Sequence, residues 1–414
     1  MRPGRYFLWM GGTMVALAVL AVLLGVLVDP YRMFGTPGLP GWTTLKPRIY
    51  ERPGIAKIYQ LERIAPRTVL LGNSRVEIGF DPASPEWPAD TRPIFNAAMA
   101  GQGLFTALLM LREAIATGKL KTAVVGIDFL DFLQIGYSDN FALPPVGAEE
   151  RRLLVGRDGG LNPARSLQLW RDRLASTLTI DAATDSVETL LDQDPETTTT
   201  MTPLGFNPLH EYRLFIARSG YYGLFAQKNA TYVREYRRFK PPDFSHPLRI
   251  VNYRYLLMIT RLAKAHGIQL ILFTPPYHAD YLEMLNQVGL WASFEAWQRT
   301  LADVVDAAKQ GGVQVTLFDF SIYDRFTTEP VPPRHDLTSR MRWYWESAHY
   351  KSALGDKMLK RFFHGDKSLG YELTKANVDA VLARTRSQRA QYIGRINAEG
   401  TRQPLAVPDS DRVN

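Results

Sequence analysis

The sequence contains no cysteine among its 414 residues. This absence excludes a disulfide-stapled fold, zinc sites built on thiolates, iron–sulfur clusters and a cysteine nucleophile. The histidines and carboxylates show no recognisable metal-binding spacing, so we expect neither a metal site nor a cofactor. The chain also lacks a Gly-x-x-x-x-Gly-Lys-Ser/Thr loop and a Gly-x-Gly-x-x-Gly turn after a predicted strand, which argues against nucleotide chemistry.

A concentrated basic surface is also lacking. The 49 Lys and Arg residues outnumber the 41 Asp and Glu residues, and the formal net charge is +8. Proteins that bind nucleic acid usually gather basic and aromatic residues on one element. Here the basic excess is scattered along a predicted C-terminal helix, so we expect no nucleic-acid partner. The hydrophobic share of 46% suits a globular core, and the length predicts two domains or one large domain with an insertion.

Only one long apolar run is present, from Phe7 to Val28. As a helix it is roughly 33 Å long, which is enough to cross the hydrocarbon core of a bilayer. A cleaved signal peptide is the competing interpretation, but the run exceeds a typical signal-peptide core and ends in Gly-Val-Leu-Val-Asp-Pro, which is not a cleavage site. We therefore expect a transmembrane signal anchor at residues 7–28. No later run reaches about 18 uncharged residues, which predicts a single-pass membrane protein.

The residues that flank the apolar run predict its orientation. Arg2 and Arg5 precede it, which favours a cytoplasmic tail at residues 1–6. The main domain is then expected on the periplasmic or extracytoplasmic side of the inner (cytoplasmic) membrane. Asp29-Pro30 and a Gly- and Pro-rich stretch follow the run, so we interpret residues 29–60 as a juxtamembrane linker.

Beyond this linker, short apolar runs alternate with longer amphipathic stretches. This alternation predicts an α/β fold in which helices cover a parallel sheet, a flavodoxin-like sandwich formed by residues 61–134 and 248–365. We expect strands at 68–72, 122–127, 269–274 and 313–318, and helices at 104–116, 250–265, 294–308 and 353–363.

The residues between the two parts of the predicted sandwich lack this rhythm. We interpret residues 135–247 as an insertion or cap. Its acidic stretch, 181–196, is expected to be a mobile surface loop. The Tyr- and Phe-rich stretch 204–239 is expected to fold over the sheet edge as core or, alternatively, to line a carbohydrate or acyl groove. Residues 366–414 are expected to form a C-terminal helix and tail.

A serine follows the first predicted strand in the sequence Gly72-Asn73-Ser74-Arg75. Open α/β sheets place their sites at the carboxyl ends of the strands, and a serine in such a turn exposes its hydroxyl. Its own backbone N–H can help to hold an oxyanion. The alternative is an ordinary strand-to-loop turn, because Gly, Asn and Ser are common turn residues.

A carboxylate and a histidine stand three residues apart near the last predicted sheet-covering helix. In a helical turn, this spacing would place Glu346 and His349 on one face, where the carboxylate can orient the imidazole. His349 would then take the proton from Ser74. The alternative is a surface Glu beside a histidine at the edge of the core.

Taken together, the Gly-x-Ser after the first strand and the carboxylate-x-x-His before the last sheet-covering helix resemble the SGNH/GDSL hydrolase superfamily, over roughly half of the chain. The resemblance implies a flavodoxin-like sandwich with Ser74 as nucleophile, His349 as base and Glu346 as the acidic partner. Asn73 and Glu346 both stand where the family more commonly has Asp.

Two middle segments resemble the family less closely. The segment from Phe95 to Gly103 is similar to the second block, which implies that the Gly101 N–H and the Asn96 side chain join the Ser74 N–H as oxyanion donors. Asp128 occupies the place of the usual Asn of the third block, and an ionised Asp cannot donate.

Three further residues are predicted to contact substrate, namely Arg75, Asp128 and His278, because they follow strands of the predicted sheet. An alternative for Asp128 is an ion pair with Arg75. An alternative for His278 is a loop histidine whose ring is satisfied by backbone groups.

The expected function is that of an SGNH-like serine O-acyltransferase or esterase that acts on an envelope or exported polysaccharide. Similar membrane-anchored members of the superfamily acylate exopolysaccharide or cell-wall polymers beside a multi-span acyl-donor membrane protein, so the resemblance implies such a partner in addition to the lipid bilayer. A non-catalytic polysaccharide-binding or assembly-scaffold protein with a degenerate site is the alternative. A glycosidase that uses Asp128 and Asp131 is the weakest, since paired acids after a strand are common on surfaces.

Overall fold

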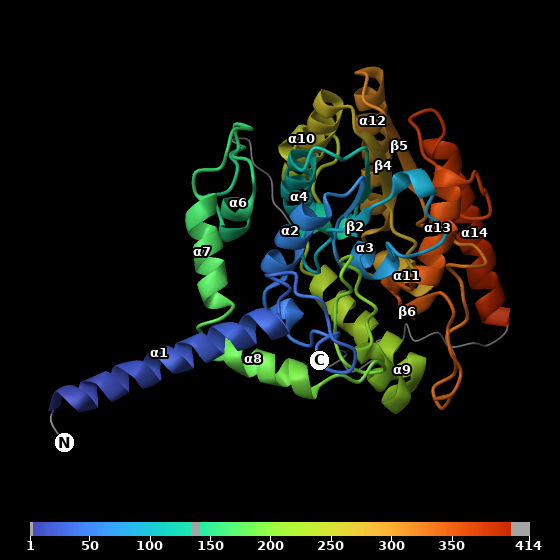
Figure 1. Cartoon of the computed structure of the whole chain (residues 1–414). Helices are drawn as coiled ribbons and strands as arrows, with labels where there is room; N and C mark the ends of the chain where they lie inside the picture. The colour runs from blue at the N-terminus through green and yellow to red at the C-terminus, as the bar shows by residue number, and fades with distance from the viewer. Residues whose placement is uncertain (1–2, 135–140, 399–414) are drawn as a thin grey trace. The chain divides into compact units, whose positions relative to one another are not determined.

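The computed structural model describes residues 3–134 and 141–398 (Figure 1). The chain forms two compact units. Unit 1 comprises Met1–Ile64, Pro144–Pro203 and Asn207–Glu211, and unit 2 comprises Ala65–Leu143, Leu204–Phe206 and Tyr212–Asn414. Each unit is described by itself below.

Unit 2 contains a six-stranded sheet in the order β2-β1-β3-β4-β5-β8. The first five strands are parallel and β8 pairs antiparallel with β5. Because parallel strands need crossover helices, both faces of such a sheet are covered, and the residues of its five parallel strands are almost all buried. The strands are β1 (Thr68–Leu71), β2 (Ile94–Asn96), β3 (Thr122–Gly126), β4 (Gln269–Thr274), β5 (Val315–Asp319) and β8 (Tyr371–Glu372).

Alternate residues of the strands belong to two different layers. Leu70, Val124 and Ile271 are neighbours in register and pack in one cluster with Leu354 and Met358 of α13 (Ser352–Phe363). The intervening strand residues are buried as well, under the helices that cross over between the strands, α4 (Leu104–Ala116), α10 (Val251–His266) and α12 (Trp291–Gln310). The predicted α/β class with a parallel sheet is therefore confirmed.

All four predicted strands are present in the sheet, with bounds that differ by one or two residues at some ends. The two edge strands β2 and β8 were not predicted, since two or three residues are too few to show a strand pattern. The remaining elements of unit 2 are α3 (Ser74–Gly79), α5 (Phe129–Gln134), α9 (Glu211–Tyr236), α11 (Ala279–Gln287), β6 (Tyr344–Glu346), β7 (His349–Tyr350), α14 (Val378–Ala398), and the 3₁₀ turns Ala89–Thr91 and Pro247–Arg249.

The predicted linker is folded. Residues 29–60 run into α2 (Pro53–Ile64), and the side chains of Tyr31 and Tyr59 are buried in a cluster with Ala182. Lys46 is also fully buried and donates to the carbonyl of Val28. The Gly- and Pro-rich composition therefore reflects tight turns inside unit 1 rather than a free connection. The other short elements of unit 1 are Ile49–Glu51 and α6 (Ala148–Arg152).

The predicted insertion divides between the two units. Its acidic stretch forms α8 (Ile180–Leu191) after α7 (Arg165–Ala175), which corrects the expected mobile loop. Its aromatic stretch forms α9, kinked at Gly220, where the φ of +66° and a carbonyl 2.8 Å from an added Cβ both require glycine. Tyr221 and Phe225 of α9 are buried in the same cluster as Leu70, Val124 and Ile271 of the sheet, as expected of core residues. Residues 135–140 lie outside the described part.

One N-terminal helix, α1 (Pro3–Val28), is long and apolar enough to cross a membrane. Its stretch Tyr6–Val28 has a mean hydropathy of 2.5, and 11% of its most apolar window is buried against the rest of the protein. A helix of this length and exposure matches the thickness of a bilayer core.

Candidate active site

Ser74 lies at the point where β1 gives way to α3. Gly72 turns the chain with a φ of +144°, and a Cβ there would meet Val76 at 2.6 Å. The side chain of Asn73 then caps α3 by accepting from the backbone N–H of Arg75 at 3.1 Å. Ser74 is the first residue of the helix, partly exposed at the carboxyl end of a central strand. This is the position that the strand-end rule predicted.

His349 and Glu346 face each other across a β-hairpin. Strands β6 and β7 pair Glu346 directly with His349, and Ser347-Ala348 form the turn. The spacing of three residues therefore arises from a tight hairpin and not from the helical turn that we expected. The backbone N–H of His278 donates to the carbonyl of Ser347 at 3.0 Å, which anchors the turn.

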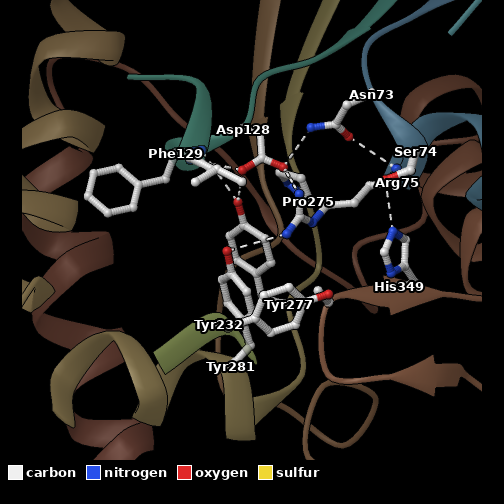
Figure 2. A network of polar contacts seen from close by, with 12 residues as sticks. Asn73, Ser74, Arg75, Asp128, Phe129, Tyr232, Pro275, Tyr277, Tyr281 and His349 are labelled. Atoms are coloured by element: carbon white, nitrogen blue, oxygen red, sulfur yellow. Dashed lines mark hydrogen bonds and ion pairs between the residues drawn. The ribbon is translucent and has the colours of Figure 1, made fainter. Parts of the chain in front are cut away.

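The structure brings Ser74, His349 and Glu346 into one chain of hydrogen bonds. Ser74 Oγ lies 2.8 Å from His349 Nε2, and His349 Nδ1 is bonded to Glu346 Oε1 (the Ser74–His349 contact is drawn in Figure 2). The side chain of His349 is 14% exposed and that of Glu346 is fully buried. A hydroxyl, an imidazole and a carboxylate in this order can pass a proton from the serine to the histidine, and the carboxylate is the buried end of the chain.

Glu346 is held as a carboxylate although it is buried. Burial alone would raise its pKa, but the interaction with His349 and the N–H of Ala348, at 2.9 Å from Oε2, lower the pKa below its usual value. Tyr232 donates to Oε1 at 3.3 Å. An ionised Glu346 selects the tautomer of His349 that carries its proton on Nδ1, which leaves Nε2 free to accept from Ser74.

Close backbone packing sets the distance between the serine and the histidine. A Cβ on Gly79, at the end of α3, would lie 2.1 Å from the ring of Tyr350, the residue after His349. A Cβ on Gly355 of α13 would lie 1.9 Å from the carbonyl oxygen of Gly79. Glycine at both positions is therefore needed to let α3, β7 and α13 approach each other.

We expect Gly355→Ala to lower stability by about 1 to 3 kcal/mol, because the new methyl group forces α13 away from α3. Thermal unfolding of the full chain in detergent measures this effect. Gly394→Ala is the matched control, since Gly394 also lies in a helix and has open space around it. An equal melting temperature for Gly355→Ala and Gly394→Ala would contradict the packing argument.

Arg75 and Asp128 form a buried ion pair beneath Ser74, which confirms the alternative stated for Asp128. Both side chains are at most 5% exposed. Asp128 also accepts from Asn73 Nδ2 at 2.9 Å and from the hydroxyl of Tyr277 at 2.8 Å (Figure 2). Burial would lower the pKa of Arg75, but the charge of Asp128 outweighs it and raises the pKa. The predicted substrate contacts of Arg75 and Asp128 are therefore wrong, because neither side chain reaches the surface.

The two predicted oxyanion donors outside Ser74 have different positions. The side-chain amide of Asn96 is fully buried and donates to the carbonyls of Val76 and Phe80, both at 3.0 Å. It holds the turn after α3 and is not free to bind a substrate oxygen, which corrects that prediction. Gly101 lies on an exposed turn with a φ of +71°, and its N–H remains a predicted donor.

His278 is a structural residue, as its alternative interpretation stated. Its ring is fully buried, with Nε2 2.8 Å from the carbonyl of Glu329 and Nδ1 accepting from the N–H of Asp280 at 3.1 Å. Burial lowers the pKa of His278 to about 4, so the ring is neutral at pH 7. The predicted substrate contact is wrong because both ring nitrogens are already paired below the surface.

A buried acid lies next to this histidine. Burial, and then the charge of Glu283, raise the pKa of Asp280 from 3.8 to about 7, while the nearby side-chain amide of Asn229 opposes the shift. The unfolded chain therefore loses this proton near pH 4 and the folded chain near pH 7. The contribution of Asp280 to the free energy of unfolding is fully present below pH 4 and is lost as the pH rises to 7. His278 acts in the opposite direction over the same window, because its folded pKa is depressed.

We expect Asp280→Asn to stabilise the protein at pH 8 by about 2 to 4 kcal/mol and to change stability little at pH 4. The difference in the free energy of unfolding between wild type and variant isolates the effect of Asp280, since His278 is present in both proteins. Unfolding midpoints in denaturant at the two pH values measure this difference. If Asp280→Asn unfolds at pH 8 at the same denaturant concentration as the wild type, Asp280 is not held protonated in the folded protein.

Two polar residues at the site come from α9 and were not predicted. Tyr232 contacts Glu346, and Asn229 accepts a hydrogen bond from the hydroxyl of Ser347. They are three residues apart and so lie on one face of the helix. The Tyr-rich composition of the stretch indicated packing over the sheet, but no local pattern links these positions to residue 346.

Within the described residues, no group of three or more His, Asp and Glu side chains is placed to hold a metal ion. A scan against protein-family models gives no match to this chain, and a search of curated proteins gives no significant match. The arrangement of Ser74, His349 and Glu346 is therefore the feature of this chain that points to a function.

Proposed function

We propose that this chain is an SGNH-like serine enzyme, an O-acyltransferase or acyl esterase that works through an acyl-enzyme on Ser74. The observation that carries the proposal is the 2.8 Å contact between Ser74 Oγ and His349 Nε2, together with the bond from His349 to the buried Glu346. A serine activated by an adjacent base that a third group orients is the arrangement used for acyl transfer.

In the proposed reaction, Ser74 Oγ attacks the carbonyl carbon of an acyl ester while His349 Nε2 takes the hydroxyl proton. The tetrahedral intermediate collapses, the ester bond breaks, and His349 returns the proton to the departing alcohol. A water or sugar hydroxyl then attacks the acyl-enzyme and gives its proton to His349, which passes it back to Ser74 Oγ. Glu346 stabilises the imidazolium that forms in both halves.

The proposed oxyanion hole consists of backbone donors. The N–H of Ser74 lies at the first turn of α3, and the N–H of Gly101 is the second donor. Asp128, at the place of the family's Asn, instead fixes the residues on either side of Ser74, because it binds both Asn73 and Arg75. This arrangement supports a hole with fewer donors than the family usually has.

Several features support the proposed relation to the SGNH/GDSL superfamily. The serine follows the first strand of a parallel sheet, and the carboxylate-x-x-His segment comes directly before α13, as in a flavodoxin-like SGNH sandwich. In this proposal α1 is an uncleaved anchor in the inner membrane, and unit 2 acts outside the cytoplasm on an envelope or exported polysaccharide. Transfer is favoured over hydrolysis, with a multi-span membrane protein as acyl donor.

A second candidate is a non-catalytic polysaccharide-binding or scaffold protein. The observation that favours it is the engagement of Asp128 with Arg75 and of Asn96 with backbone carbonyls, since neither side chain then serves the oxyanion. This candidate requires that Ser74 does not react.

Labelling of the full chain in detergent with a fluorophosphonate separates the two candidates. We expect a covalent adduct on Ser74, because the reagent forms its bond with the serine oxygen that His349 deprotonates. Ser74→Ala abolishes the adduct. Ser245→Ala is the matched control, since Ser245 also contacts a histidine, at 2.9 Å from Nδ1 of His246, but lies exposed outside this site. A folded wild type that gives no adduct would support the scaffold.

A further inference from the structure

Exposed apolar side chains are unevenly distributed in the part of the chain that the structure describes. Outside α1, most of the large apolar side chains that face solvent belong to unit 1, although unit 2 is much the larger unit. They concentrate on α7 and α8 and on the connection between them. Protein surfaces that face water rarely carry contiguous apolar patches of this kind. Such patches mark contacts with a membrane or with another protein.

Helix α7 has its polar side inside and its apolar side outside. Gln168 and Asp172 are buried, and the carboxylate of Asp172 accepts from Arg152 and from the hydroxyl of Tyr59, both at 2.7 Å. The opposite face exposes Leu167, Trp170 and Leu174 by 58%, 61% and 51% respectively. The spacing of three and four residues places these three on one stripe. A helix of a water-facing surface has the reverse arrangement.

Helix α8 shows the same inversion. It buries the small side chains of Ala182, Ser186 and Thr189 and exposes Ile180 by 83% and Leu191 by 81%. Positions 180, 187 and 191 lie within one narrow sector of the helix, because they are seven and four residues apart.

The acidic residues of α8 occupy a sector of their own. Glu188 pairs with Arg48 at 2.8 Å, and Asp185 accepts from the hydroxyl of Tyr31. Asp181 lines the same polar pocket as Asp185. The charges of the helix are therefore directed to one side and leave its apolar sector uninterrupted.

Helix α8 and the α7–α8 connection lie beside the part of α1 where its exposed stretch ends. Residues 6–20 of α1 are all exposed, and other parts of the chain begin to bury the helix only in its last two turns. A Cβ on Gly25 would lie 2.9 Å from the backbone of Ser176, in the α7–α8 connection. Leu24 shares an apolar groove of about 400 Å³ with Val187 and Leu191. In Figure 1, α8 runs beside the C-terminal part of α1.

The length of α1 sets the depth of this region. A hydrocarbon core of about 30 Å takes about 20 helical residues. Counted from Tyr6, the first residue after the basic N-terminus, that length ends at Gly25. The last part of the core therefore coincides with the level at which α8 packs on α1.

We propose that the outward faces of α7 and α8 are inserted in the lipid leaflet in which α1 ends, as an interfacial helical pair. The inference rests on the proposed crossing of the membrane by α1. Helices of 11 and 12 residues are too short to span a bilayer but suit the boundary between head groups and acyl chains. Lipid is the occupant that the observations favour, because the apolar sectors continue the exposed surface of α1.

Exposed arginines on α7 fit the same surface. Arg171 and Arg173 flank the apolar stripe, and the guanidinium of Arg173 lies 5.5 Å from the ring centre of Trp170. A tryptophan beside arginines is a combination found at membrane interfaces, where the ring sits among the head groups and the cations reach lipid phosphates.

The absence of cysteine in the chain permits a direct test. Single substitutions Leu174→Cys and Leu191→Cys, each carrying an NBD fluorophore, are reconstituted as full chains in phosphatidylcholine–phosphatidylglycerol nanodiscs. We expect lipids with a nitroxide near the head group to remove about half of the emission at both positions, because interfacial helices lie about 5 to 10 Å deep. Asp181→Cys, on the polar sector of α8, is the matched control and should lose less than about a tenth.

Leu17→Cys separates insertion of α7 and α8 from the crossing by α1. Position 17 lies near the middle of the span, about 15 Å from the head groups, so it is probed with lipids that carry the nitroxide deep in the acyl chain. Quenching at positions 17, 174 and 191, with position 181 spared, supports the inserted pair. Quenching at position 17 alone overturns it, keeps the crossing by α1, and assigns the apolar faces to a protein partner. Loss of quenching at position 17 as well contradicts the proposed crossing itself.

Discussion

His349→Ala is expected to lower kcat for hydrolysis of p-nitrophenyl acetate by about 10³-fold or more, with a much smaller change in KM. The loss arises because Ser74 Oγ, 2.8 Å from Nε2, has no other base within hydrogen-bond reach among the described contacts. Ser74→Ala should lower kcat to a similar value. Steady-state kinetics of the detergent-solubilised full chain measure both.

The double variant Ser74→Ala/His349→Ala tests whether the two residues act as one unit. Residues of a relay lose their joint effect when either is removed, so the double variant should be no slower than the slower single variant. Additive losses would indicate that the two side chains contribute independently, which contradicts the relay. Glu346→Gln should retain the geometry but lose the charge that orients His349, and should fall between wild type and His349→Ala.

Asp128→Ala is expected to destabilise the protein by about 3 to 5 kcal/mol, because it leaves the buried guanidinium of Arg75 without its counter-charge. The change also removes the partner of Asn73, so activity should fall with stability. Denaturant unfolding of the full chain measures the loss.

Arg75→Met with Asp128→Leu is the informative comparison for this pair. Replacement of both charges by apolar groups removes the cost of an unpaired buried ion, so the double variant should be more stable than Asp128→Ala. Equal or greater destabilisation of the double variant would show that the packing of these side chains, against the stacked rings of Tyr277 and Tyr281, outweighs their charge.

Local patterns in the sequence indicate the candidate serine and histidine because turns and strand ends are determined by a few neighbouring residues. Ser74 was predicted because a parallel strand directs its carboxyl end to a common edge, and β1 and its turn follow that rule. His349 and Glu346 were predicted as a pair because of their spacing, but the spacing could not distinguish a helical turn from a hairpin. The structure shows a hairpin, and the pairing across β6 and β7 brings the two side chains together.

The predictions that proved wrong involve burial, which no local pattern reports. His278 and Arg75 follow strands as substrate-contacting residues often do, yet both are buried, where the ring nitrogens of His278 are paired and the guanidinium of Arg75 is held by Asp128. Asn96 has the donor that an oxyanion needs, but three backbone carbonyls take up its amide. Tyr232 was missed for the same reason, because its partner Glu346 is 114 residues away.

Periodicity, hydropathy and turn chemistry act over a few residues, so the amino-acid sequence alone is enough to predict the α/β class, the N-terminal apolar helix and the two segments that hold the candidate serine and histidine. The tertiary structure decided which polar side chains face solvent and which are locked in the core. Tertiary contacts also make residues 29–64 and 144–203 part of one unit, in which α7 and α8 carry their apolar side outward. These outcomes depend on contacts between segments that are distant in the chain, and such contacts are selected by the packing of the whole molecule.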